Sequence, residues 1–247
     1  MKYFFLVPAI YLYCDGWIKS SSILTGLAVF LLVAVFLAYA SFNISFGAYL
    51  IAFCRKPTKE KLIALSFDDG PHPEYTPQTL NILKQYDLKA TFFVIGARIA
   101  GNENILKRIH SEGHQTANHS FSHKNTFPLL GAKKMAADLL QCEQAISRVT
   151  GCVTRWFRPP FGVTNPNVAK AVKIRNYKVA GWSIRSLDTV KTDKDKVVRR
   201  VVSKLHPGAV VLLHDHLPDT PYILEQIIVQ AKEKGYEFVT VERLFSC

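Results

Sequence analysis

The chain contains 247 residues, of which 49% are hydrophobic and 20% are charged. This composition supports a folded core and excludes both a disordered chain and a small disulfide-stapled fold. The 31 basic residues exceed the 19 acidic ones, and the net charge of +12 favours anionic neighbours such as lipid head groups, acidic glycans or nucleic acid. Because the basic residues form no aromatic-rich stripe, we expect no nucleic-acid partner.

The first 56 residues are predicted to form a membrane anchor. No residue from position 20 to position 54 is charged, and residues 23–42 are an apolar stretch long enough for a helix to cross about 30 Å of hydrocarbon. A shorter apolar run at residues 3–13 contains Pro8 and lacks a small-residue cleavage site, so we expect it to be retained. The sequence therefore predicts at least one transmembrane helix and membrane lipid as a partner.

The cysteines do not indicate a disulfide framework or a structural zinc site, because their number is odd and none form a CxxC pair. They are Cys14, Cys54, Cys142, Cys152 and Cys247. Cys142 and Cys152 either pair in an oxidising compartment or are two small buried residues.

Residues 57–247 are predicted to form a single α/β domain, because apolar runs alternate with segments of helical periodicity. Seven strands are expected at residues 62–67, 91–95, 115–118, 155–158, 178–182, 209–214 and 237–241. Helices are expected between them at residues 76–86, 104–111, 132–149, 167–173, 194–205 and 222–234. This order predicts a parallel sheet closed into a compact or distorted barrel rather than an eightfold one.

The first chemical motif, SFDDGP at residues 66–71, ends a predicted strand with the adjacent carboxylates Asp68 and Asp69. Adjacent acids repel, so both ionise readily only beside a cation. One carboxylate can hold a metal ion while the other acts as a base on water. The alternative is a solvated Asp-Asp-Gly turn.

The second motif, HSFSH, places His119 and His123 just after the third predicted strand. Histidines four residues apart lie on one face of a helical turn and can bind one ion, although ordinary surface histidines share this spacing. Two histidines and one aspartate leave coordination positions open, which is typical of a catalytic metal site.

Two further motifs, RPPFG at residues 158–162 and LLHD at residues 212–215, also follow predicted strands. The two prolines either present the amide of Phe161 as an oxyanion donor or simply end the strand. Arg158 is a candidate partner for a carboxylate. His214 is either a proton donor at the barrel mouth or a core-edge histidine. Because barrel enzymes place their chemistry at the carboxyl ends of strands, we expect the motifs to converge.

With these motifs, the chain resembles the polysaccharide deacetylases of carbohydrate esterase family 4, also called the NodB or chitooligosaccharide deacetylase homology domain. The resemblance covers residues 61–245, and its five ordered motifs are SFDDGP, HSFSH, RPPFG, WSIRSLDT and LLHD. It implies a distorted (β/α)7 barrel that removes N-acetyl groups from N-acetylglucosamine-type sugars in a glycan such as peptidoglycan or chitooligosaccharide.

The resemblance also implies a metal site and a catalytic base. Asp69, His119 and His123 match the ligands of one divalent ion, usually Zn²⁺, with Co²⁺, Ni²⁺ or Mn²⁺ as alternatives. Asp68 matches the general base that accepts a proton from the attacking water. Arg158 matches the residue that pairs with this base.

The remaining matches concern proton donation and substrate contact. His214 matches the general acid, and Asp188 the carboxylate that orients it. The backbone N–H of Phe161 matches an oxyanion donor, with Phe in place of the commoner Tyr, and Leu212 matches a wall of the acetyl pocket. The expected substrate contacts are Phe161, Leu212, Pro160, Trp182 and Arg185.

The fourth motif departs from the family pattern, which often reads Trp-Ser-x-Asp-x-x-Asp-Trp. Arg185 and Thr189 stand where an acid and an aromatic wall are usual. Arg185 either binds an acidic or phosphorylated substrate or pairs with a neighbouring carboxylate.

Two other functions stay open: a membrane-anchored glycan-binding module without turnover, and a deformylase or deacylase of a lipid-linked amino sugar. The basic residues that follow the apolar stretch favour a cytoplasmic domain. The glycan substrates of the family generally lie outside the cytoplasm, so we expect the extracytoplasmic side. The sequence predicts no particular oligomeric state.

Overall fold

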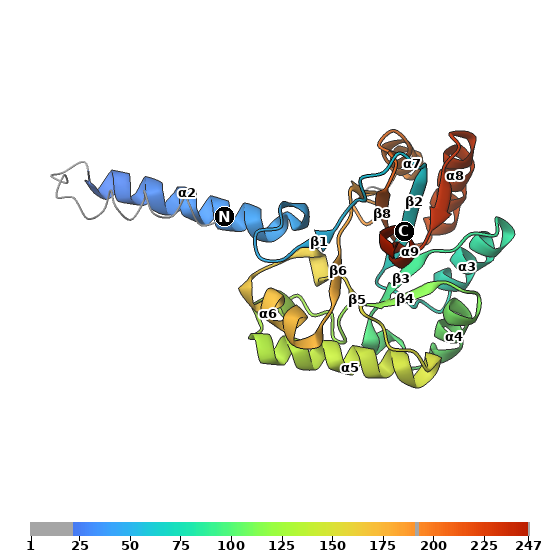
Figure 1. The fold of residues 1–247 in the computed structure, drawn as a ribbon, viewed down its shortest axis with the longest axis horizontal. Helices are drawn as coiled ribbons and strands as arrows, with labels where there is room; N and C mark the ends of the chain where they lie inside the picture. The colour runs from blue at the N-terminus through green and yellow to red at the C-terminus, as the bar shows by residue number, and fades with distance from the viewer. Residues whose placement is uncertain (1–21, 191–192, 247) are drawn as a thin grey trace.

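A computed structural model gives the architecture in Figure 1 and describes residues 22–190 and 193–246. The apolar run at residues 3–13, together with Cys14 and Cys247, lies outside the described residues. Cys142 is buried and Cys152 is exposed, and both are free thiols. The structure therefore favours two unpaired cysteines, but only Cys142 is buried as that alternative expects, since Cys152 follows the end of α5 at the surface.

An apolar helix, α2 (Ser22–Phe42), precedes the α/β domain and projects away from it (Figure 1). The 18 residues Thr25–Phe42 have a mean hydropathy of 2.2, and 6% of them are buried. A core helix of a soluble protein would be mostly buried, so α2 is a candidate membrane span. A signal sequence has a similar composition and position.

The domain is built on a curled sheet of nine strands in the part of the chain that the structure describes. The strand order is β1-β6-β5-β4-β3-β2-β8-β7, and β9 pairs with β2. All pairings between these strands are parallel. The strands are β1 (Ala52–Phe53), β2 (Leu62–Asp68), β3 (Thr91–Val94), β4 (Gln115–Asn118), β5 (Trp156–Phe157), β6 (Lys178–Ala180), β7 (Ile184–Arg185), β8 (Ala209–His214) and β9 (Glu237–Val239).

Helices connect most of the successive strands and flank the sheet, whereas β1 and β2, and β6 and β7, are joined without a helix (Figure 1). They are α3 (Tyr75–Gln85), α4 (Glu103–Ser111), α5 (Ala132–Thr150), α6 (Pro166–Arg175), α7 (Lys194–Val202), α8 (Thr220–Glu233) and α9 (Val241–Ser246). Short 3₁₀ helices occur at η1 (Ile44–Phe46), η2 (Gly96–Arg98), η3 (Phe127–Leu129) and η4 (Pro160–Gly162). The predicted α/β class with a parallel sheet is confirmed.

The two faces of strand β2 carry different kinds of residue, because successive side chains of a strand point to opposite faces of the sheet. Ile63, Leu65 and Phe67 belong to the large core cluster formed with the flanking helices. The other face carries Ala64 and then the buried polar residue Ser66 and the carboxylate of Asp68. The strand therefore ends by presenting a carboxylate to the inside of the curled sheet.

Three short elements, β1, β7 and α9, were not predicted, because elements of two to six residues carry little periodicity. The strand predicted at residues 237–241 ends at Val239, since Val241 begins α9. β1 pairs with β6, and the Lys56 amide donates to the carbonyl oxygen of Gly208. The sheet thus begins at Ala52, ahead of the predicted domain start at residue 57.

Candidate active site

The inward face of β2 meets the guanidinium of Arg158, which follows β5. Nη1 of Arg158 donates to Oδ1 of Asp68 at 2.6 Å and to Oγ of Ser66 at 2.9 Å. Nη2 donates to the carbonyl oxygen of Gly181 at 2.9 Å, and the guanidinium lies 4.1 Å from the ring centroid of Phe93. Arg158 is fully buried, so its charge needs a partner, and Asp68 supplies it.

The three predicted metal ligands come together beside this pair. The Nε2 atoms of His119 and His123 are 3.2 Å apart. Oδ1 of Asp69 lies 3.5 Å from Nε2 of His119 and 3.3 Å from Nε2 of His123. A tetrahedral ion with bonds of about 2.0–2.2 Å separates its ligand atoms by about 3.3–3.6 Å. The three donor atoms therefore have the spacing that one divalent ion requires.

The donor atoms are also available to a cation. Oδ1 of Asp69 is buried and has no hydrogen-bond partner within the described residues. Nδ1 of His119 lies 2.8 Å from the carbonyl oxygen of Arg158, which places the ring proton on Nδ1 and leaves the Nε2 lone pair free. Two imidazole nitrogens and one carboxylate oxygen suit zinc and other first-row divalent ions, so these residues fit the implied metal.

The surroundings of Asp69 and His123 shift the pKa values of both groups. Burial opposes the ionised form of Asp69, but its interactions with the nearby imidazoles of His119 and His123 outweigh burial and hold its pKa well below the usual range. Burial, assisted by the charge of His119, lowers the pKa of His123 to about 4. An ionised carboxylate and a neutral imidazole are the forms that bind metal.

The HSFSH segment is an irregular loop, so the predicted helical turn is wrong. Ser120 and His123 have φ angles of 69° and 46°, in the left-handed region that a right-handed helical turn excludes. The carboxylate of Asp138 on α5 accepts the amide protons of Phe121 and Ser122 at 2.7 and 3.1 Å. These bonds hold the bend that brings the two imidazoles together.

His214, at the end of β8, pairs with Asp188. Nδ1 of His214 lies 2.8 Å from Oδ1 of Asp188, and the His214 amide donates to Oδ2 at 2.8 Å. Burial disfavours the protonated imidazole, but the hydrogen bond and charge of Asp188 outweigh it and raise the pKa of His214. Oγ of Ser186 also donates to Asp188 at 2.9 Å, which fixes the carboxylate. This pair suits a proton donor.

A cavity of about 260 Å³ is lined both by the three candidate metal ligands and by His214. Its lining residues are Asp68, Asp69, His119, His123, Phe161, Gly162, Trp182, Arg185, Thr189, Leu212 and His214. Three predicted site residues, Arg158, Asp188 and Pro160, are buried and do not line it. Arg158 and Asp188 instead hold lining residues in place, and Pro160 belongs to the rigid η4 turn.

Phe161 has a left-handed backbone, with φ 60° and ψ 5°. This conformation costs a bulky residue about 1–3 kcal/mol, and such strain is common at functional sites. The Phe161 ring lies 4.9 Å from the ring of His123. Its amide makes no hydrogen bond to the described parts of the chain, which leaves this N–H available to an oxygen atom. The next residue, Gly162, abuts Trp182 so closely that a Cβ would collide with the indole.

Arg185 and Thr189, the positions that depart from the family pattern, both line the cavity. The guanidinium of Arg185 is exposed and forms no ion pair with any described residue. The alternative in which Arg185 pairs with a neighbouring carboxylate therefore finds no support among the described residues.

Two residues beside Asp69 were not predicted. Nδ1 of His216 lies 3.9 Å from Oδ2 of Asp69, and Arg98 on η2 donates to the Asp69 carbonyl oxygen. The His-Asp-His sequence at residues 214–216 was a local signal for His216. Arg98 had no such signal, because η2 meets the end of β2 only in the folded chain.

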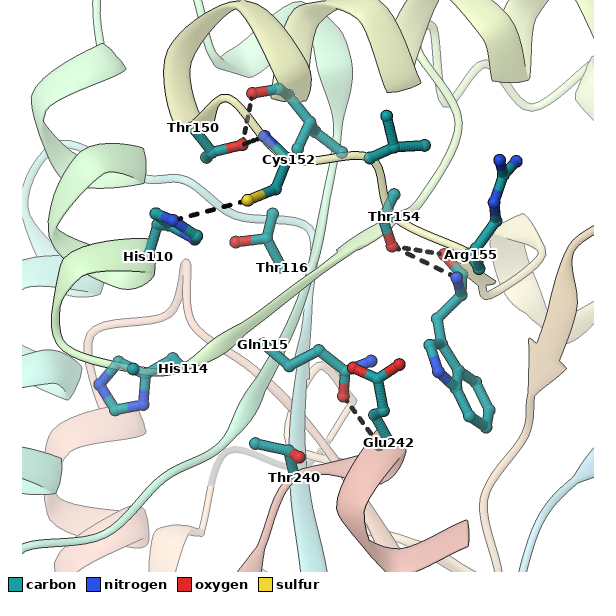
Figure 2. A pocket seen from close by; sticks show the side chains of 14 residues that line it. His110, His114, Gln115, Thr116, Thr150, Cys152, Thr154, Arg155, Thr240 and Glu242 are labelled. Atoms are coloured by element: carbon teal, nitrogen blue, oxygen red, sulfur yellow. Dashed lines mark hydrogen bonds between the residues drawn. The ribbon is translucent and has the colours of Figure 1, made fainter. Parts of the chain in front are cut away.

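A second cavity, of about 310 Å³, lies at the amino-terminal ends of the strands (Figure 2). Gln115 begins β4 here, whereas His119 follows the other end of that strand. In this cavity Nε2 of His110 lies 3.7 Å from Sγ of Cys152, and Oε1 of Gln115 accepts the amide proton of Glu242. None of the five motifs contributes a lining residue, so the candidate chemistry belongs to the opposite end of the sheet.

Comparisons with known proteins agree with this arrangement. A family model described as polysaccharide deacetylase matches residues 55–180. A peptidoglycan-N-acetylglucosamine deacetylase of Bacillus cereus is 36% identical over 199 residues, which cover 76% of this chain and 90% of the relative. The solved peptidoglycan N-acetylglucosamine deacetylase Bc1960 has a TM-score of 0.74 and 34% identity, with 78% of this chain and 92% of that chain covered.

The structure of BA3943 from Bacillus anthracis, a pseudoenzyme of carbohydrate esterase family 4, aligns with a TM-score of 0.72 and 30% identity. The alignment covers 77% of this chain and 67% of that chain. These similarities confirm the predicted distorted barrel. They also show that this fold occurs both with and without activity.

Proposed function

Because the chain belongs to the polysaccharide deacetylase family, we propose that it is an active, metal-dependent hydrolase that removes N-acetyl groups from N-acetylglucosamine-type sugars in a glycan. The predicted family and enzyme class are confirmed by the family match and by relatives named as deacetylases. The identity of the sugar, the identity of the acyl group and the roles of the individual residues are our proposals.

The observation that best supports turnover is the convergence on one cavity of a buried carboxylate, three metal-type ligands and a His-Asp pair. A divalent ion held by Asp69, His119 and His123 would act as a Lewis acid on the acyl carbonyl and make water more acidic. The remaining steps fall to side chains and amides of the chain itself.

Asp68 is the proposed general base. Its Oδ1 accepts the hydrogen bond from Arg158, so Oδ2 is the atom left to accept a proton from the attacking water. Oδ2 lies 3.7 Å from Nε2 of His119, at the border of the ligand cluster. The amide of Phe161 is the proposed donor to the oxyanion that develops as water adds to the acyl carbon.

His214 is the proposed general acid. Asp188 favours its protonated form, which donates to the leaving nitrogen as the C–N bond breaks. Overall, water supplies a hydroxyl group to the acyl carbon and a proton to the nitrogen. The products are acetate and a free amino sugar.

Release of acetate tests this proposal. The metal-loaded chain is incubated with chitooligosaccharides, with peptidoglycan and with an N-formylated amino sugar, and acetate and formate are both measured. We expect acetate. A binding module would retain these glycans and release neither acid from them or from a lipid-linked N-acetyl amino sugar, and a deformylase would release formate from the formylated sugar and no acetate; either result would overturn the proposed reaction.

Two substitutions distinguish the role of the proposed base from the role of the metal ligands. Asp68→Asn should abolish turnover and keep the bound metal, whereas His119→Ala should lose both. Asp87→Asn is the matched control, because this side chain is 98% exposed and lies outside the cavity. An active Asp68→Asn enzyme would refute the role of Asp68.

We also propose that the domain faces the extracytoplasmic side, where peptidoglycan, the substrate in the names of its relatives, is found. A reporter fused after Cys247 tests this placement. Activity of a reporter that works only in the cytoplasm would contradict it.

A further inference from the structure

The carboxyl-terminal end of α2 is attached to the loop that carries Phe161. The Thr164 amide donates to the carbonyl oxygen of Ser41 at 2.9 Å, and Oγ1 of Thr164 lies 3.5 Å from the carbonyl oxygen of Ala40. Ala40 is buried, and Ile44, just beyond the helix, belongs to a core cluster of the domain. The candidate membrane span is therefore held against the active-site wall rather than joined by a free linker.

An apolar cavity of about 610 Å³ lies beside this last part of α2. We call it the apolar groove, and its lining includes Leu37, Phe42, Pro128, Leu129, Phe161 and Val163. Phe161 lines both the apolar groove and the catalytic cavity. The groove therefore adjoins the proposed reaction site at Phe161 and is bounded by α2.

A smaller cavity, of about 320 Å³, also lies beside the end of the helix and shares Phe42 with the apolar groove. Its lining includes Phe42, Trp182 and Arg185, and the last two also line the catalytic cavity. Arg185, which is exposed and forms no ion pair with a residue that the structure describes, thus lies between the end of α2 and the candidate metal ligands. A guanidinium in this position can bind a phosphate with two parallel hydrogen bonds.

The apolar groove lies where a bilayer surface would be. The 18 residues of the candidate span extend about 27 Å as a helix, close to the thickness of about 30 Å of a hydrocarbon core. Phe42 would then lie near the boundary between hydrocarbon and head groups. At this level both α2 and the domain expose apolar side chains, because Phe42 is 73% and Leu129 is 83% exposed. A contiguous apolar surface of this kind marks a binding site.

We propose that the substrate is an N-acetylated amino sugar joined through phosphate to a membrane hydrocarbon chain, with the chain in the apolar groove and the phosphate on Arg185. This inference rests on the proposed deacetylase function and specifies its substrate class. The groove is mostly apolar, with Ser41, Asn125 and Asn165 as the polar residues of its lining, so a sugar polymer would leave most of the hydroxyl groups that it places there without partners, which costs free energy. A hydrocarbon chain gains free energy there, and it already lies at the same depth as α2.

The test compares two probes with the metal-loaded full chain in vesicles of phosphatidylethanolamine and phosphatidylglycerol. One probe is N-acetylglucosaminyl phosphate esterified to a short polyprenyl chain, and the other is the same sugar phosphate esterified to a methyl group. We expect kcat/KM for acetate release to be at least about tenfold higher for the polyprenyl probe.

Substitutions test whether the apolar groove causes the preference for the polyprenyl probe. Leu129→Ser should lower the polyprenyl-to-methyl ratio of kcat/KM about five- to tenfold, because an exposed side chain is changed without disturbing the core. Val153→Ser is the matched control, since Val153 is 53% exposed and lines the cavity at the opposite end of the sheet. Arg185→Gln should lower kcat/KM for both phosphate probes relative to a neutral methyl glycoside.

The outcomes separate the two proposals. Equal kcat/KM for the two probes, or an unchanged ratio in Leu129→Ser, would overturn the lipid-linked substrate while leaving the deacetylase standing. Release of acetate from chitooligosaccharides but not from the polyprenyl probe would also overturn the lipid-linked substrate and leave the deacetylase function standing. No acetate from any substrate would overturn the proposed function itself.

Discussion

Arg158 holds Asp68 with its side chain and His119 with its backbone. Nη1 of Arg158 lies 2.6 Å from Oδ1 of Asp68, and its carbonyl oxygen lies 2.8 Å from Nδ1 of His119. One buried residue therefore orients both the proposed base and a proposed metal ligand. The two functions are coupled, because a shift of Arg158 moves both groups.

Replacing Arg158 tests this coupling. Arg158→Met should lower the unfolding free energy by about 3–5 kcal/mol and reduce activity, because it leaves the Asp68 carboxylate buried without its partner. Urea denaturation of the metal-loaded protein measures the stability. In the double variant Arg158→Met with Asp68→Asn, no carboxylate is stranded, so the loss should be smaller than the sum of the single losses. Strictly additive losses would argue against the coupling.

Asp138 is predicted to control metal affinity without touching the metal. Asp138→Ala removes the acceptor of the Phe121 and Ser122 amides and should weaken zinc binding about 10- to 100-fold, because the bend that joins the two histidines loosens. Competition with a zinc-binding dye measures the affinity. Asp138→Asn keeps one carbonyl acceptor and should be intermediate. Unchanged zinc affinity in Asp138→Ala would show that the loop is held by other contacts.

The pH dependence of activity should respond to Asp188. Asp188 raises the pKa of His214 against the opposing effect of burial, and a general acid works only while protonated. Activity therefore falls as pH rises through this pKa. Asp188→Asn should lower the pKa and move the basic limb of the kcat/KM profile to lower pH. Asp87→Asn should leave that limb in place, and an unmoved limb in Asp188→Asn would exclude His214 as the acid.

The amino-terminal boundary of the domain can be located by truncation. The sequence predicts that residues 57–247 form a soluble, active domain, but β1 and Ile44 contribute to the sheet and the core ahead of that point. A fragment of residues 43–247 should therefore melt above one of residues 57–247. Loss of the Ile44 side chain alone accounts for about 2 kcal/mol, or about 4–8 °C in a domain of this size. Equal melting temperatures would support the boundary at residue 57.

Much of the fold could be predicted because it depends on local patterns. The seven predicted strands all occur, two with the predicted bounds and five with ends shifted by one or two residues, since buried parallel strands are apolar runs that end at polar residues. The order of the five motifs likewise placed Asp69, His119 and His123 at carboxyl ends of strands, and parallel pairing brings such ends to one edge. The sequence did not predict the shapes of the loops. For that reason the HSFSH histidines were placed on a helical turn, whereas the structure has an irregular loop there.

By itself, then, the sequence determined the alternation of strands and helices, the apolar helix and the set of chemical side chains, because each follows from neighbouring residues. Only the tertiary structure decided that Asp138 bends the histidine loop, that Arg98 and His216 stand beside Asp69, and that the end of α2 packs against the wall of the catalytic cavity. These features depend on contacts between residues far apart in the chain. No local pattern records such contacts, since they form only when the sheet curls.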